Sequence, residues 1–140
     1  MMITLERVRA EDLETIIAIQ RASFKAVYEK YEDEYDPYLE DRERIKWKLA
    51  ERPNSYYYFV KEDEEKMGFL RIQTNEELTK AWLGTAAILP QYQGKGYGSE
   101  GLRLLEKEFS TVRQWDLCTV LQVQEIITKH LLPTSTRKST

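Results

Sequence analysis

The sequence predicts an α/β fold, an α+β arrangement around one mixed sheet, and three observations support this class. The 140 residues are enough for one domain and leave little room for a second. Runs of strand-forming residues are interleaved with runs whose apolar residues recur at helical spacing. A glycine-rich segment then joins a nearly all-apolar run to the last amphipathic helix. The expected order is strand, helix, helix, strand, strand, strand, helix, strand.

The first part of the chain predicts one strand and two helices. Residues 3–8 alternate apolar and polar side chains as a short strand does, and residues 13–19 place their apolar side chains at helical spacing. A second helix is expected around residues 45–49, and it should end before Pro53.

The middle of the chain predicts the rest of the sheet. Residues 55–60 and 67–72 are rich in strand formers and flank a charged turn, so they should form an antiparallel hairpin. Residues 81–89 are nearly all apolar and end at Pro90, which predicts a strand buried on both faces and central to the sheet. A helix is expected after the glycines, and residues 115–121 should form the last strand.

Composition excludes several classes of protein. A net charge of −3 lacks the basic footprint of a general nucleic-acid binder. The single cysteine, Cys118, excludes an internal disulfide, and no metal-ligand cluster surrounds it. No stretch approaches the ~20 apolar residues of a membrane span, and the N-terminus lacks the apolar core of a signal peptide. We therefore expect a cytoplasmic protein without a nucleic-acid, membrane or metal partner.

The segment from Gln93 to Ser99 contains three glycines in seven residues, between a buried strand and a helix. Glycines let consecutive backbone amides turn toward one concavity, and the helix adds the positive end of its dipole. Such an arrangement favours a pyrophosphate group. A Walker A loop would need Gly-Lys-Ser/Thr after four intervening residues, and a dinucleotide fingerprint would need its third glycine one residue later. Both alternatives fail on spacing.

The remaining pattern resembles that of the GNAT acetyltransferases, Gln/Arg-x-x-Gly-x-Gly/Ala, which Gln93, Gly96 and Gly98 satisfy. The preceding Ala87-Ile88-Leu89-Pro90 resembles the cofactor-binding strand of that family, and the element order agrees over roughly residues 3–121. The resemblance implies an N-acetyltransferase that takes acetyl-CoA as its co-substrate and acts on a primary amine.

The resemblance also assigns cofactor-binding residues. The backbone of Ala87, Ile88 and Leu89 would pair with the pantetheine arm beside a splayed strand. The pyrophosphate would be held by Gln93, Gly94, Lys95, Gly96, Tyr97, Gly98 and Ser99. For Lys95 a purely solvated loop position is an equal alternative.

The acceptor side is less defined. In this family an amine attacks the thioester directly, so the enzyme needs a neutral amine, a stabilised oxyanion and a proton for the leaving thiolate. The sequence nominates no catalytic base, because Glu76 and Glu77 lie in a turn and the only histidine, His130, lies in the irregular tail.

Residues 28–41 are the best indication of the acceptor, a small molecule or a peptide, because they contain seven acids, four tyrosines and one lysine. An acidic, aromatic wall would attract a cationic amine. The alternative is a solvated helical face.

The C-terminus departs from the family pattern. After the last strand, GNAT proteins usually continue with a helix whose tyrosine often protonates the thiolate, but the last tyrosine here is Tyr97. No acid follows Glu125 and no aromatic residue follows Trp115, so we divide the chain into a GNAT-like domain, residues 1–121, and an atypical tail, residues 122–140, with a disordered end.

Truncation and a change of reading frame near Val123 are two hypotheses for this tail. If the tail is genuine, the C-terminal part of the fold is incomplete, with an exposed sheet edge that residues 126–132 or a partner chain, as in a homodimer, could cover. The competing function is then a catalytically impaired acetyl-CoA-binding domain.

Overall fold

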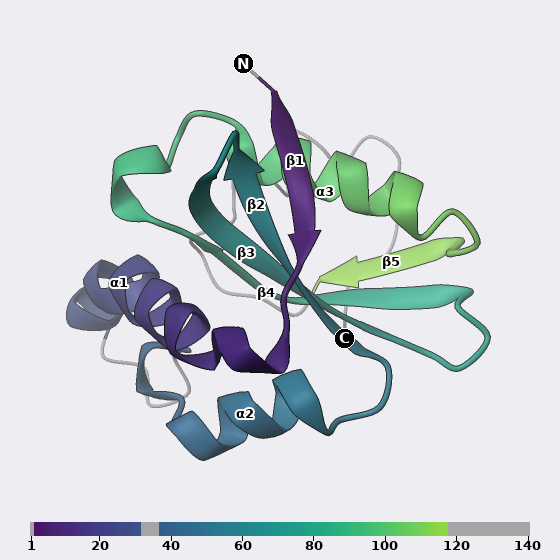
Figure 1. The fold of residues 1–140 in the computed structure, drawn as a ribbon, viewed down its shortest axis with the longest axis horizontal. Helices are drawn as coiled ribbons and strands as arrows, with labels where there is room; N and C mark the ends of the chain where they lie inside the picture. The colour runs from purple at the N-terminus through teal and green to yellow at the C-terminus, as the bar shows by residue number, and fades with distance from the viewer. Residues whose placement is uncertain (1, 32–36, 118–140) are drawn as a thin grey trace.

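The computed structural model of the chain describes residues 2–31 and 37–117 (Figure 1). The helices and strands are β1 (Ile3–Arg7), α1 (Leu13–Tyr31), α2 (Arg42–Ala50), β2 (Ser55–Glu62), β3 (Glu65–Thr74), β4 (Lys80–Ile88), α3 (Tyr97–Glu108) and β5 (Gln114–Leu117). Short 3-10 turns cover residues 10–12, 37–39 and 90–92. The predicted order is confirmed, whereas the predictions for Cys118, His130 and the tail lie outside the described residues.

The described strands form one mixed sheet in the order β1-β2-β3-β4-β5. The first three pairings are antiparallel, and β4 and β5 are parallel. The expected hairpin of β2 and β3 is confirmed. The expectation that β4 is central is wrong, because β3 lies in the middle and β4 lies beside the last described strand. An apolar run shows that a strand is buried, but it does not show how many strands lie on each side.

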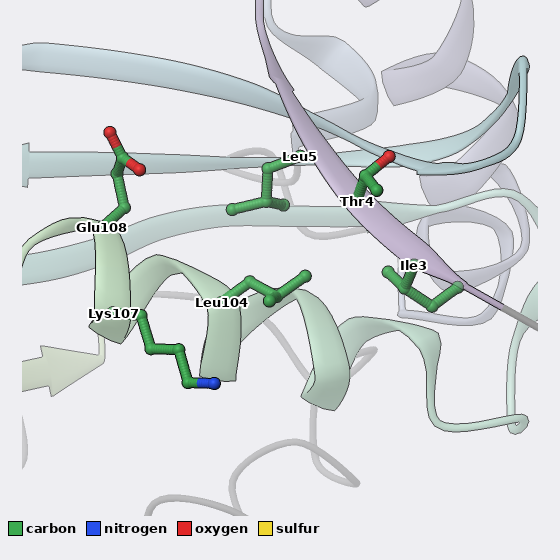
Figure 2. Close-up of a pocket in the computed structure, with 6 residues that line it drawn as sticks. All are labelled: Ile3, Thr4, Leu5, Leu104, Lys107 and Glu108. Carbon is green, nitrogen blue, oxygen red and sulfur yellow. The ribbon is translucent and has the colours of Figure 1, made fainter.

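Helices cover both faces of this sheet. Figure 1 shows α1 and α2 on one side and α3 on the other. On the α3 side, a groove of about 350 Å³ lies between β1 and the later turns of α3, and Figure 2 shows its lining side chains. None of these residues belongs to the predicted cofactor-binding set. In the described part of the chain, no helix has the length and apolar character needed to cross a membrane.

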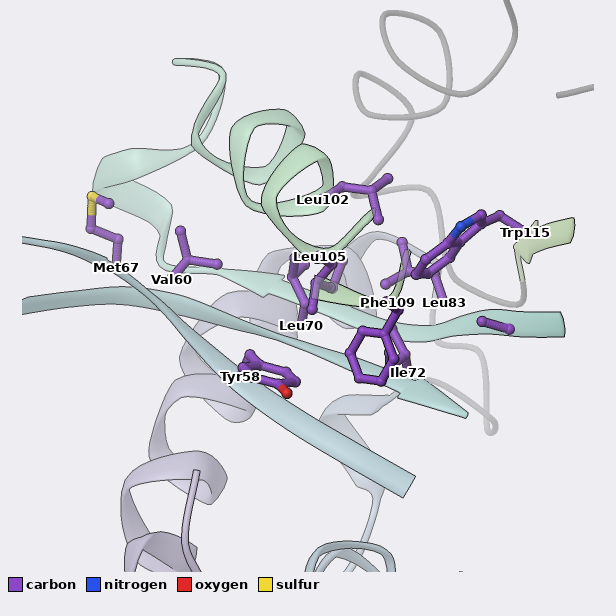
Figure 3. Close-up of a cluster of buried hydrophobic side chains, with 12 residues drawn as sticks. Tyr58, Val60, Met67, Leu70, Ile72, Leu83, Leu102, Leu105, Phe109 and Trp115 are labelled. Carbon is purple, nitrogen blue, oxygen red and sulfur yellow. The ribbon is translucent and has the colours of Figure 1, made fainter. Parts of the chain in front are cut away.

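The larger core lies between α3 and the sheet. Figure 3 shows side chains of α3 meeting those of the strands, among them Leu102 and Leu105 from the helix and Trp115 from β5. The second core lies under α1 and α2 and contains Phe59 and Phe69. Successive side chains of a strand point to opposite faces, and β2, β3 and β4 contribute side chains to both cores.

The register between β4 and β3 shifts half-way along β4. Leu83 pairs with Ile72 and Thr85 pairs with Arg71, so Gly84 is an extra residue in the ladder, a β-bulge. The pairing of β4 with β5 covers only Lys80 to Leu83 among the described residues. We call this point, with Gly84 on β4 and Asp116 on β5, the fork. Beyond the fork, the side of β4 that faces away from β3 has no strand partner in the described part of the chain.

Candidate functional site

The loop after β4 positions the predicted pyrophosphate-binding residues. A 3-10 turn at residues 90–92 ends the strand, and α3 begins at Tyr97. Gly94 has a φ of 76° and Gly96, the N-terminal cap of α3, a φ of 85°. This left-handed conformation is open to glycine without steric cost. The two glycines are therefore required by the course of the backbone.

The backbone amides of this loop are unused donors. The backbone amides of residues 94–99 donate no hydrogen bond to the described part of the chain, and the first bond of α3 runs from the Glu100 amide to the Gly96 carbonyl at 3.0 Å. A Cβ added at Gly94 or Gly96 would meet no atom within 4 Å. The hydroxyl of Ser99 is buried and has no partner among the described residues. Open space, free amides and an unpaired hydroxyl at a helix N-terminus fit a phosphate group.

Gln93 connects this loop to the strand. Its side-chain amide donates to the Ile88 carbonyl at 2.8 Å, which fixes the start of the loop against the end of β4. The Leu89 amide donates to the Met67 carbonyl of β3 at 2.9 Å. Successive residues of a strand point their N–H and C=O groups alternately to its two edges. Because Leu89 bonds to β3, the N–H and C=O of Ile88 point to the opposite edge of β4, away from β3. Of the three predicted strand residues, Ile88 is thus the one whose backbone N–H and C=O point away from β3, and its carbonyl accepts the Gln93 hydrogen bond.

The two remaining loop side chains differ in their surroundings. Lys95 is exposed. The ring of Tyr97 packs edge-on against Tyr92 at 5.9 Å between centroids, which supports the first turn of α3. The residues predicted for cofactor binding thus converge on one strand end, one loop and one helix N-terminus.

Comparison with protein families decides the class of protein. The model of the acetyltransferase (GNAT) family matches residues 14–125, which is most of the chain. The chain belongs to the GNAT acetyltransferase family. It is an N-acetyltransferase, and acetyl-CoA is its co-substrate. A comparison with curated protein sequences gave no significant match.

Solved structures with this GNAT fold have low sequence identity to the chain. PaiA N-acetyltransferase from Thermoplasma acidophilum, in complex with coenzyme A, is 23% identical with a TM-score of 0.63, and the match covers 79% of this chain and 73% of that one. An aminoglycoside acetyltransferase from an uncultured soil metagenomic sample, in complex with sisomicin, is 17% identical with a TM-score of 0.64. The match covers 90% of this chain and 83% of that one. A predicted acetyltransferase from Clostridium acetobutylicum, with acetyl-CoA, is 15% identical with a TM-score of 0.65. The match covers 91% of this chain and 88% of that one. At these identities the likeness shows the fold.

The fork of this GNAT domain contains a buried cation that the sequence reasoning missed. Arg71 of β3 is 5% exposed, and its guanidinium donates from Nε to the Ser55 hydroxyl at 3.2 Å and from Nη2 to the Gln73 side-chain oxygen at 2.7 Å. Burial lowers the pKa of Arg71. The signal in the sequence was a single charge inside the otherwise apolar strand of residues 67–72, and an isolated glycine at position 84 inside another strand.

A buried carboxylate lies on the other arm of the fork. Asp116 of β5 is 6% exposed and pairs in register with Trp82 of β4. Its neighbour Trp115 packs in the core under α3, so Asp116 points to the opposite face, toward the α1 and α2 side. Asp116 Oδ1 has no hydrogen-bond partner in the part of the chain that the structure describes. Oδ2 accepts a hydrogen bond from the side-chain Nε2 of Gln114 at 3.4 Å.

Two described acids of the segment, Glu40 and Asp41, are already engaged in the fold. Glu40 forms ion pairs with Lys48 and Arg44 and accepts a hydrogen bond from Gln20 at 2.9 Å. Asp41 caps α2 by accepting from the Arg44 amide at 2.8 Å. Residues 32–36, which hold four of the seven acids, lie outside the described residues. The prediction of an acidic acceptor wall is therefore not tested by the structure.

The two acids that the sequence did not nominate as a catalytic base, Glu76 and Glu77, lie outside the candidate site. Glu76 and Glu77 are exposed in the turn between β3 and β4. Among the described residues no group of histidine, cysteine, aspartate and glutamate side chains could hold a metal ion.

Proposed function

We propose that the chain moves the acetyl group of acetyl-CoA to a primary amine of a small molecule or peptide. The observation that carries this proposal is the loop of residues 93–99, with its unused amides, the open space beside Gly94 and Gly96, and a Ser99 hydroxyl that has no partner among the described residues. In the proposal these groups hold the pyrophosphate, and the pantetheine arm lies next to Ile88, along the side of β4 that faces away from β3.

The direction of the bound arm follows from this placement. The loop lies at the C-terminal end of β4, so an arm that lies along the side of that strand facing away from β3 runs back toward Gly84. Ile88 lies four residues from Gly84, about 13 Å along the strand at roughly 3.3 Å per residue. The thioester end then lies toward the fork, where the acceptor amine must also bind.

The chemistry at the fork requires a group that accepts a proton. Acetyl-CoA supplies the activated acyl carbon. When the new C–N bond forms and the C–S bond breaks, the amine loses a proton and the departing sulfur gains one. We assign to Asp116 the role of accepting the amine proton, directly or through one water, because it is a buried carboxylate at the fork whose Oδ1 has no hydrogen-bond partner among the described residues.

Acetyl-CoA binding and acetyl transfer test the proposal separately. Because a ligand that binds only the folded state stabilises it, acetyl-CoA at 100 times its Kd should add about 2.7 kcal/mol and raise Tm. Acetyl transfer should then be measured over a panel of primary amines that are cationic, neutral or zwitterionic. Binding without turnover of any amine would support the impaired acetyl-CoA-binding domain instead. A preference for polycations would support the prediction of an acidic acceptor wall.

A further inference from the structure

We propose that Arg71 is a specificity residue that binds a carboxylate group of the acceptor, so that the substrate is an amine that also carries a carboxylate, such as an amino acid or a peptide with a free C-terminus. This inference rests on the proposed acetyl transfer and names its acceptor class.

The first step of the argument is that Arg71 lacks an anion. Its two hydrogen-bond acceptors, Ser55 and Gln73, are both uncharged. A guanidinium carries five N–H donors, so three remain. No carboxylate of the described chain forms an ion pair with Arg71. A buried charge without a counter-ion is costly, so this arrangement calls for an explanation beyond stability.

The second step is that its surroundings are cationic. Arg44 and Arg52 act on Arg71 as like charges, and the nearby acid, Glu40, is paired with Lys48 and Arg44. Burial lowers the pKa of Lys48 as well. The fork also holds the carboxylate of Asp116, but no ion pair joins Asp116 to Arg71 in the described part of the chain, so Arg71 keeps donors for another anion.

The third step is position. A Cβ on Gly84 would lie 2.4 Å from Arg71 Nη1, so the guanidinium lies directly over the bulge of β4 at the fork. The thioester end of the proposed arm lies at the same place. An acceptor whose amine reaches the acyl carbon would therefore bring its other groups within reach of Nη1.

The fourth step is chemical fit. The planar guanidinium pairs with a carboxylate through two parallel hydrogen bonds, and Ser55 and Gln73 hold it in one orientation. A single delocalised cation suits a singly charged, planar carboxylate.

The test compares matched acceptors in matched variants. Glycine and lysine are paired with glycinamide and lysinamide, which keep the amine and lose the carboxylate charge. For the wild-type protein we expect kcat/KM to favour the carboxylate member. In Arg71→Gln that preference should fall by about 10- to 100-fold, the effect of losing a hydrogen bond to a charged group, mainly through KM. Arg71→Lys should retain part of it, and the exposed Arg113→Gln should retain all of it.

A second variant protects the test against a loss of folding. Gly84→Ala keeps the charge but moves the end of the flexible Arg71 side chain, so the preference should fall while acetyl-CoA still raises Tm. An unchanged preference in both Arg71→Gln and Gly84→Ala, or a wild-type preference for the amides, overturns the inference.

A binding measurement separates this inference from the proposed function. Calorimetry with N-acetylglycine and N-acetylglycinamide in the presence of coenzyme A needs no turnover. Tighter binding of the carboxylate that is lost in Arg71→Gln supports the inference even when no amine is acetylated, and equal binding of the two ligands contradicts it.

Discussion

Gly96 begins α3 with a φ of 85°, and the space beside its Cα is open. We expect Gly96→Val to cost about 1–3 kcal/mol of stability, because a β-branched residue is strained in this conformation. Its side chain would also enter the concavity, so the affinity for acetyl-CoA should fall more than about 10-fold. Calorimetric titration with acetyl-CoA measures this effect.

Asn54 provides the matched control for Gly96, because it also has a positive φ, 59°, and lies away from the loop. Asn54→Val should be strained to a similar degree and should bind acetyl-CoA as the wild-type protein does. If both variants lost affinity equally, the effect would come from general destabilisation and not from the concavity.

Asp116 is the residue to which we assign proton transfer from the amine. Asp116→Asn keeps the shape of the side chain and removes the base, so kcat should fall by about 10²- to 10⁴-fold while the affinity for acetyl-CoA is unchanged. The exposed Asp63→Asn serves as the control. An Asp116→Asn variant with the wild-type rate and pH profile would remove Asp116 from the mechanism.

At the scale of elements, α3 holds the loop in place through the core beneath it. Leu105 is fully buried, whereas its neighbour Leu104 is only half-buried at the groove beside β1. Leu105→Ala should cost about 2–5 kcal/mol, because it leaves a cavity between α3 and the sheet. Leu104→Ala should cost clearly less. Urea denaturation of the two variants gives both values, and equal costs would contradict this placement of the helix.

The elements themselves were largely predictable from the sequence. The apolar periodicity placed β2, β3, β4 and α3 within a few residues of their ends, since each buries a regular face. Periodicity does not carry the position of a strand within the sheet, which is why β4 was expected at its centre. That position depends on contacts between residues distant in the sequence.

The candidate site was predictable only in part, for a related reason. The glycine-rich loop is contiguous in the sequence, and the spacing of its glutamine and glycines resembles the cofactor-binding pattern of the family. The fork joins Arg71, Gly84 and Asp116 from three strands, and only the pairing registers bring them together. A lone arginine in an apolar strand and a lone glycine in another were visible, but the sequence did not show that one lies over the other.

At the scale of the whole molecule, the two faces of the sheet differ in composition. The core under α3 contains the hydroxyl of Tyr58 and the indole N–H of Trp115, and the same face of β3 buries Thr74. The face toward α1 and α2 buries Gln20, Arg71 and Asp116 in addition to its apolar core. The buried charged groups of the described sheet therefore lie on the α1 and α2 side. This division is consistent with the stability cost of functional polar groups.

Tyr57, on the same face of the sheet as Arg71, should make the whole domain less stable at high pH. Its ring is 2% exposed, and burial raises the pKa of its hydroxyl well above the ordinary value of 10.0. Below pH 10 the tyrosine is neutral in the folded and unfolded states alike. Above pH 10 it ionises in the unfolded state while the folded state resists ionisation, so stability is lost as the pH rises.

Tyr57→Phe removes this dependence. Between pH 8 and pH 11 the wild-type protein should lose about 1 kcal/mol more stability than the variant, since one pKa unit corresponds to about 1.4 kcal/mol. Urea denaturation of both proteins at the two pH values measures the difference, and the comparison at pH 8 removes the cost of losing the hydroxyl itself. Parallel losses in the two proteins would show that Tyr57 is not the group that links the fold to high pH.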